Sequence, residues 1–141
     1  MIAYSTSQKI YVKKMHVGFD YWNDTKAKMP RLVFLRIKNA VLGEKYELSV
    51  AVVCARKMHD LNKRWGNKDK TTDILSFPLS KDEGEIYISP AMAKKEAKNF
   101  DRPYDNFILF LFIHGLVHLK GYEHGVAMER VEKRFREQFY V

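Results

Sequence analysis

The segment 105–119 is apolar on all sides until its last turns, where histidines appear. A helix without a polar face is stable in water only when other elements cover most of its surface. Its longest continuous apolar run, 107–113, is far shorter than the ~20 residues that span a bilayer. The segment therefore predicts a central helix buried within a folded protein, and not a membrane span.

Helical spacing of apolar residues marks four further segments. The first lies between Pro30 and Gly43, and the second is the short basic stretch Arg56–Trp65, which Gly66 ends. The third begins at Pro90, after the capping residue Ser89, and breaks at 101–103. The fourth is the last stretch, from Met128 to Phe139. In the first of these, Lys38 is expected on the polar face. In the third, Phe100 is expected on the inward side with Ala93 and Ala97.

Three other segments have the composition of strands. Residues 46–53 are β-branched and mostly apolar, which suits a strand buried within a sheet. Residues 72–78 are expected to form an extended segment that ends at Pro78. Apolar and polar residues alternate through 85–88, which predicts another strand. The chain has 141 residues, the size of one ordinary domain. We therefore expect a single domain over residues 1–141, of class α/β or α+β, with a small mixed sheet and helices packed around the central helix.

The charge balance of the chain points to a class of partner. Lys and Arg total 25 against 17 Asp and Glu, a formal net charge of +8. Such a field attracts polyanions before any contact is made, so nucleic acid is the first partner to test. The same charge also serves solubility alone, so it ranks partners without identifying one.

Cysteine usage and the N-terminus indicate a compartment. Cys54 is the only cysteine of the sequence, so no disulfide forms within the chain, which fits a reducing compartment. It follows the apolar run 48–53, where a free thiol is expected to behave as a small hydrophobe. The first residues contain no continuous apolar stretch of the kind found in secretory signals. We therefore expect a soluble, cytoplasmic protein.

Three of the five histidines lie in one short string, HGLVHLKGYEH, at positions 114, 118 and 124. On a helix, His114 and His118 lie one turn apart on the same face, close enough to reach one metal ion. Gly121 can adopt a positive φ and turn the chain, so His124 can return from the loop as a third ligand. Three imidazoles leave a fourth position open, as in catalytic zinc sites. Two histidines four apart can be coincidence, but three at this spacing favour a metal site.

The histidine spacing also matches the ligand frame of metzincin proteases, which carry a glutamate directly after the first histidine as general base. Here that position is Gly115. Peptidase chemistry therefore ranks below nuclease or other hydrolase chemistry. A bound metal would still lower the pKa of its water towards ~7 and polarise a phosphoryl oxygen.

The string HGLVHLKGYEH closely resembles the HGxLHLxGYDH signature of the YbeY family, bacterial endoribonucleases that act in rRNA maturation. Residues 61–78, LNKRWGNKDKTTDILSFP, resemble the family's LNxxYRxxDxxTDVLSFP, and residues 84–89, GEIYIS, resemble its GDIxIS strand. The resemblance covers about residues 46–130. It implies a zinc-dependent, single-strand-specific endoribonuclease that acts in 16S rRNA 3′-end maturation and ribosome quality control. It also implies one zinc ion per chain, held by His114, His118 and His124.

The sequence departs from the family pattern at one informative position. Where the family has an arginine that is thought to bind phosphate, this chain has Gly66. The nearest candidates to supply the charge are Arg64, two residues earlier, and the lysines Lys68 and Lys70. Two glutamates, Glu123 and Glu85, stand where the family tends to have aspartate, and Glu123 is a candidate catalytic carboxylate or partner of a histidine.

We expect single-stranded RNA, such as rRNA in the small ribosomal subunit, to lie across a basic cleft next to the metal. The residues expected to bind phosphates are Arg56, Lys57, Lys63, Arg64, Lys68 and Lys70. Trp65 is expected either to stack on a base or to anchor its helix, and Ser76 and Phe77 to support the metal site. Two alternatives remain open: a noncatalytic RNA- or ribosome-binding module with a structural metal, and a metal-dependent hydrolase of another substrate.

Overall fold

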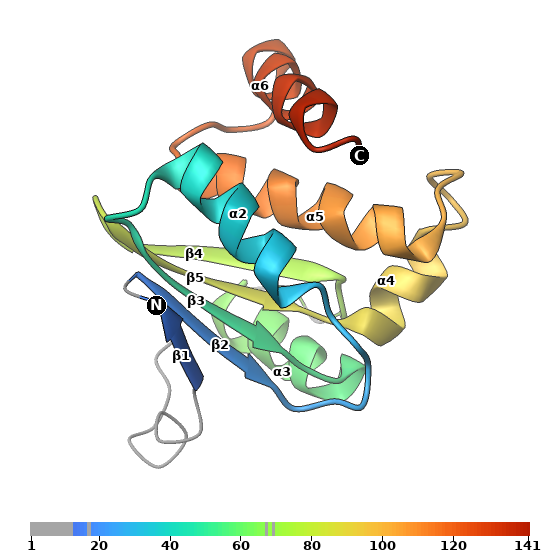
Figure 1. Ribbon diagram of the computed structural model, residues 1–141. Helices are drawn as coiled ribbons and strands as arrows, with labels where there is room; N and C mark the ends of the chain where they lie inside the picture. Colours follow the sequence, from blue (N-terminus) through green and yellow to red (C-terminus); the bar gives the residue numbers. More distant parts are fainter. Residues whose placement is uncertain (1–12, 17, 67, 69) are drawn as a thin grey trace.

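The computed structural model describes residues 13–16, 18–66, 68 and 70–141. Within these residues, one twisted sheet has helices on both faces (Figure 1). The elements in chain order are β1 (Lys13–His16), β2 (Phe19–Asn23), α2 (Arg31–Leu42), β3 (Glu47–Val52), α3 (Ala55–Trp65), β4 (Ile74–Ser80), β5 (Glu83–Ile88), α4 (Pro90–Glu96), α5 (Tyr104–Leu119) and α6 (Val126–Gln138). The fold class predicted from the sequence is confirmed.

The described strands form a five-stranded mixed sheet in the order β1-β2-β3-β5-β4. The three inner strands β2, β3 and β5 are parallel, and the edge strands β1 and β4 run antiparallel to their neighbours. Val50 of β3 pairs with Ile86 of β5, and both are fully buried. Strands covered on both faces are apolar on both sides, which explains the continuous apolar run of β3.

Helix α5 is the central helix that the sequence predicts. It lies along one face of the sheet beside α2, and α6 covers its outer side (Figure 1). Phe112 of α5 stacks on Phe34 of α2 with ring centroids 4.1 Å apart. A Cβ atom at Gly115 would lie 2.8 Å from Ser76 Oγ and 2.9 Å from Ile74 Cδ1, so a glycine is what allows α5 to approach β4 this closely. The Ser76 hydroxyl donates to the Gly115 carbonyl at 3.3 Å.

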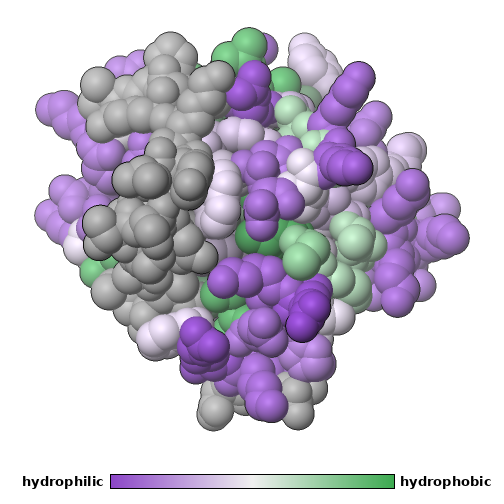
Figure 2. All heavy atoms as spheres, turned by 90° about the horizontal axis from the view of Figure 1, so that it is seen from below, coloured by the Kyte–Doolittle hydropathy of each residue, from purple (hydrophilic) through white to green (hydrophobic). Residues whose placement is uncertain are grey.

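Helix α3 covers the opposite face of the sheet and buries a smaller apolar cluster. Met58 and Leu61 of α3 pack there against Tyr87 of β5. Seen from this side, the surface is mostly hydrophilic around a small central hydrophobic area (Figure 2). Within the described part of the chain, no helix is long and apolar enough to cross a membrane.

Three expectations about individual residues are wrong. Lys38 is fully buried, not on a polar face, because its ammonium group reaches over the end of α2 and donates to the Glu44 carbonyl at 3.1 Å. Cys54 is exposed, because it occupies the N-cap position of α3 where the chain leaves the sheet. Phe100 is 51% exposed, because α4 ends at Glu96 and the following turn carries the ring away from the inward side.

Of the other local signals, helix capping is confirmed and the expected strand end at Pro78 is wrong. Ser89 caps α4, accepting a hydrogen bond from Met92 N at 3.3 Å, and Pro90 is the first residue of that helix. Pro78 does not stop its strand, which continues to Ser80. A proline is tolerated there because β4 is an edge strand, whose outer backbone groups need no partner strand. No element was expected before Pro30, where β2 lies.

Candidate metal centre

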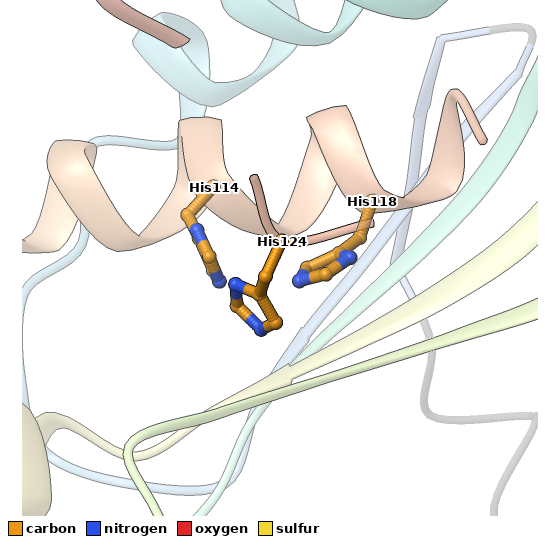
Figure 3. Close-up of side chains that lie close together, drawn as sticks. All are labelled: His114, His118 and His124. Atoms are coloured by element: carbon orange, nitrogen blue, oxygen red, sulfur yellow. The ribbon is translucent and has the colours of Figure 1, made fainter. Parts of the chain in front are cut away.

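The three histidines of the string 114–124 converge on one point. His114 and His118 project from the same side of α5, and His124 projects towards them from the segment before α6 (Figure 3). One ring nitrogen of each lies within 4.8 Å of those of the other two. The ring centroids of His124 are 5.3 Å from His114 and 4.7 Å from His118. The structure thus brings together all three ligands expected from the sequence.

The return of His124 depends on the way in which α5 ends. Gly121 has φ = 110°, a conformation that favours glycine, as expected from the sequence. The Gly121 amide donates to the His118 carbonyl at 2.9 Å, and the Tyr122 amide donates to the Val117 carbonyl at 3.3 Å. These bonds close the helix end and direct the chain back across the last turn of α5.

Hydrogen bonds determine which nitrogen of each helical histidine is available. His114 Nδ1 lies 2.8 Å from Oε1 of Glu132, a buried residue of α6, and His118 Nδ1 lies 3.0 Å from the Tyr122 carbonyl oxygen. A backbone carbonyl cannot donate a hydrogen bond, so Nδ1 of His118 carries the proton, and the carboxylate of Glu132 favours the same tautomer in His114. In the neutral ring, Nε2 then has the free lone pair that a metal requires.

The donor set fits a metal ion of zinc type. Burial is the largest cause that lowers the pKa of His118, followed by the neighbouring His114, and this favours the neutral imidazole that binds metal. Among the described residues, no Cys, Asp or Glu joins the three histidines in a metal-ligand group. Three imidazoles with an open fourth position are typical of catalytic zinc sites. Which ion they hold stays a prediction.

The histidines lie in a cavity of about 610 Å³, named here the histidine cavity. Its wall also contains Lys68, Lys70, Glu123 and Ser76. The cavity therefore combines the three possible ligands with two lysines and one exposed carboxylate. Of the candidate phosphate-binding residues, Lys63 and Arg64 lie exposed on the last turn of α3 and do not line it.

Asn62 holds the loop that carries the two lysines, a role that no sequence signal identified. The side chain of Asn62 is almost completely buried, and its Nδ2 donates to the Lys70 carbonyl at 2.9 Å. Its backbone carbonyl accepts from the Lys68 amide at 3.1 Å. A Cβ atom at Gly66 would overlap the Asn62 side chain, so this loop conformation leaves no room for the family's arginine at that position.

The remaining candidates are distributed around the site. Glu85 is buried in β5 and does not line the histidine cavity. Trp65 is 43% exposed, so it does not anchor its helix in the core. Phe77 packs edge-on against Tyr87, on the α3 side of the sheet away from the histidines. Besides Asn62, sequence reasoning missed Glu132, which contacts His114, because it lies in a helix whose pattern indicates only packing.

Comparisons with known proteins identify a family that this chain resembles along most of its length. A family model described as endoribonuclease YbeY matches residues 18–140. The endoribonuclease YbeY of Francisella philomiragia is 34% identical over 126 residues, which covers 78% of this chain and 80% of that protein. That of Aquifex aeolicus is 37% identical over 97 residues, which covers 64% of each chain, slightly less than two thirds.

A solved structure has the same fold. The solution structure of TM1509 from Thermotoga maritima superimposes with a TM-score of 0.67 and is 24% identical in sequence. The match covers 86% of this chain and 89% of that one.

Proposed function

The chain belongs to the endoribonuclease YbeY family, and on this premise we propose that it is a metal-dependent endoribonuclease that cuts single-stranded RNA in the histidine cavity. The observation that carries the proposal is the convergence of three imidazoles, two of which have Nδ1 engaged and Nε2 directed to metal binding. They lie in the same cavity as Lys68 and Lys70, whose charges suit a phosphate backbone.

We propose zinc as the ion, because three neutral nitrogens with an open position are the donor set that catalytic zinc uses. When bound, the ion supplies Lewis acidity and activates water at neutral pH. His114, His118 and His124 would hold it, one ion per chain.

We propose separate roles for the residues around the three histidines. Glu132 and the Tyr122 carbonyl orient the two helical rings, so these rings need little rearrangement on binding the ion. Lys68 and Lys70 are proposed to bind phosphates beside the scissile bond, with Lys63 and Arg64 contacting the strand further out. Glu123 is exposed in the cavity wall and is proposed as the carboxylate that accepts a proton during cleavage.

A peptidase is disfavoured by the packing of α5. The glutamate that metzincins use would stand at position 115, which faces Ser76 and Ile74 across a contact that leaves no room for a Cβ atom. A glutamate at that position would therefore require α5 and β4 to move apart. This supports phosphodiester chemistry over peptide chemistry.

We propose rRNA of the small ribosomal subunit, at the 3′ end of 16S rRNA, as the cellular substrate, with maturation and quality control of ribosomes as the role. The cytoplasm follows from that substrate. A single-stranded oligonucleotide with the sequence of that 3′ end should be cut faster than a duplex of the same sequence. Equal cleavage of both would contradict single-strand specificity.

The central experiment combines elemental analysis with cleavage of a defined single-stranded RNA. The wild-type protein should contain one zinc ion per chain and lose activity in a chelator, and His114→Ala should lose both metal and cleavage. His59→Ala, a histidine of α3 outside the cluster, is the matched control and should keep both. RNA binding that survives chelation without any cleavage in zinc would favour the noncatalytic binding module instead.

A further inference from the structure

A second cavity of about 490 Å³ opens beside the histidine cavity, with which it shares His114 and His124. We name it the aromatic cavity, after Phe100 and Phe110 in its wall. It is bounded by α5, by the start of β4 and the residues before it, by the end of α4 with the turn that follows, and by the first turns of α6. A substrate atom at the histidines therefore has a cavity on either side of it.

The two cavities differ in charge. Lys68 and Lys70 line the histidine cavity. Four carboxylates line the aromatic cavity, those of Asp73, Glu96, Glu129 and Glu132, and among the described residues no Lys or Arg lines it. A phosphate backbone is attracted to the first cavity more than to the second, although Arg136 neutralises Glu129 at the edge of the second. A neutral group with hydrogen-bond donors is therefore favoured in the second cavity.

Phe100 offers an exposed ring in that wall. Its centroid lies 5.1 Å from that of Phe107 and 5.5 Å from that of Phe110, so one side of the ring is held by the core. The side chain nonetheless remains 51% exposed. An aromatic ring that is fixed on one side and bare on the other is the usual platform on which nucleobases stack.

Three of the four carboxylates already have partners. Asp73 accepts backbone hydrogen bonds at its own position and at Ile74, and burial raises its pKa. Glu132 accepts from His114, and Glu129 pairs with Arg136 at 2.9 Å. Glu96 accepts a bond of only 3.5 Å from Asn99, so its oxygens retain capacity for a ligand. A second metal ion is not supported, because the histidines are the only metal-ligand group among the described residues.

We propose that the aromatic cavity binds a nucleobase that flanks the scissile phosphate, and that it selects bases with an exocyclic amino group over uracil. This inference rests on the proposed function. Stacking on Phe100 contributes affinity for any base, whatever the RNA sequence. Glu96 accepts a hydrogen bond from the exocyclic amino group of adenine, cytosine or guanine. Uracil has one N–H donor between two carbonyl oxygens, and these oxygens would face the carboxylates.

The test compares binding of short single-stranded oligocytidine and oligouridine by the full chain at neutral pH in a chelator. The two ligands carry equal charge and are both pyrimidines, so a difference reports on the base edge. The wild type should bind oligocytidine about tenfold more tightly, the effect of one hydrogen bond to a charged group. Equal affinities would overturn the proposal.

Two variants separate the two contributions. Phe100→Ala should weaken both ligands about tenfold through lost stacking, whereas Leu32→Ala, an exposed apolar residue of α2 outside both cavities, should change neither. Glu96→Gln should remove the preference for cytidine, and Glu137→Gln, exposed on α6, should keep it. If Phe100→Ala behaves like Leu32→Ala, or Glu96→Gln keeps the preference, the inference fails.

Cleavage is measured separately, so the inference and the function can fail independently. A cytidine preference without cleavage of any RNA in zinc would refute the nuclease proposal and leave the base site standing. Cleavage without a base preference would refute the base site alone.

Discussion

Replacing Glu132 with glutamine tests whether this carboxylate prepares His114 for metal binding. Its Oε1 lies 2.8 Å from His114 Nδ1, and the residue is 5% exposed. Glutamine has nearly the same shape, and its amide oxygen can still accept from Nδ1–H, so the substitution removes charge and preserves packing. The imidazole then becomes a weaker donor to an ion.

The expected magnitude follows from this geometry. Loss of a carboxylate that supports a metal-ligating histidine lowers metal affinity about 10- to 100-fold, which is about 1.4–2.7 kcal/mol. The metal-free protein should behave differently. A buried carboxylate beside a neutral ring is costly to desolvate, so Glu132→Gln should leave the free energy of unfolding of the metal-free protein within about 1 kcal/mol of wild type or raise it.

Two assays distinguish these effects. Competition with a chromophoric zinc chelator measures metal affinity, and urea unfolding in excess chelator measures the stability of the metal-free protein. Glu137→Gln, an exposed glutamate on the same helix, is the control and should change neither quantity. Unchanged zinc affinity in Glu132→Gln would refute the role of the carboxylate charge in metal binding. A loss of affinity that is matched by an equal loss of stability would refute it as well.

Four further predictions follow from the cavity, the core and the helix contact. Lys68→Ala combined with Lys70→Ala should make the negative slope of log affinity for single-stranded RNA against log salt shallower by about 1.4. The same change at Lys94 and Lys95, which are exposed on α4 outside the cavity, should leave the slope unchanged. Tyr46→Phe should raise the free energy of unfolding by about 1 kcal/mol, measured in urea, because the buried hydroxyl has no hydrogen-bond partner among the described residues. Burial also raises the pKa of Tyr46 to about 12 from 10.0. The folded protein should therefore keep the full stability that the neutral tyrosine contributes below pH 10 and lose it as pH rises through about 12. In Tyr46→Phe, the free energy of unfolding should no longer fall over this alkaline range. Burial lowers the pKa of His118 from 6.5, so the metal-free protein should lose stability as pH falls below 6.5 through the folded-state pKa, and a His118→Gln variant should show a weaker dependence of its urea midpoint on pH. Gly115→Ala should lower the free energy of unfolding, measured in urea, by about 1 kcal/mol. Alanine is favoured over glycine in a helix by ~1 kcal/mol, but the steric cost of its Cβ atom against Ser76 is larger. A gain in stability would contradict the close contact.

The sequence identified the features that depend on neighbours along the chain. The four-residue spacing of His114 and His118 fixes their common face on any α-helix, and Gly121 supplies the positive φ that reverses the chain. The all-round apolar character of 105–119 predicts burial whatever covers it. Capping by Ser89 is local in the same sense.

Where the local pattern was misleading, a contact with a distant element decided the outcome. Lys38 occupies a polar position in the helical pattern, yet a carbonyl beyond the helix end receives its ammonium group in the interior. Phe100 continues the apolar spacing of α4, but the helix stops earlier and the ring becomes part of a cavity wall.

In the candidate site, too, some residues could be predicted from local sequence and others depend on tertiary structure. Its three possible ligands follow from spacing in one short string, because a helix and one tight turn determine where their side chains point. Its supporting groups, Glu132 on α6 and Asn62 on α3, come from elements whose position only the packing of the helices on the sheet determines. Burial and hydrogen bonding between distant segments leave no periodic pattern in the sequence. Tertiary structure alone therefore decided that Lys68 and Lys70 line the cavity that contains the histidines, and that an aromatic, acidic cavity opens beside it.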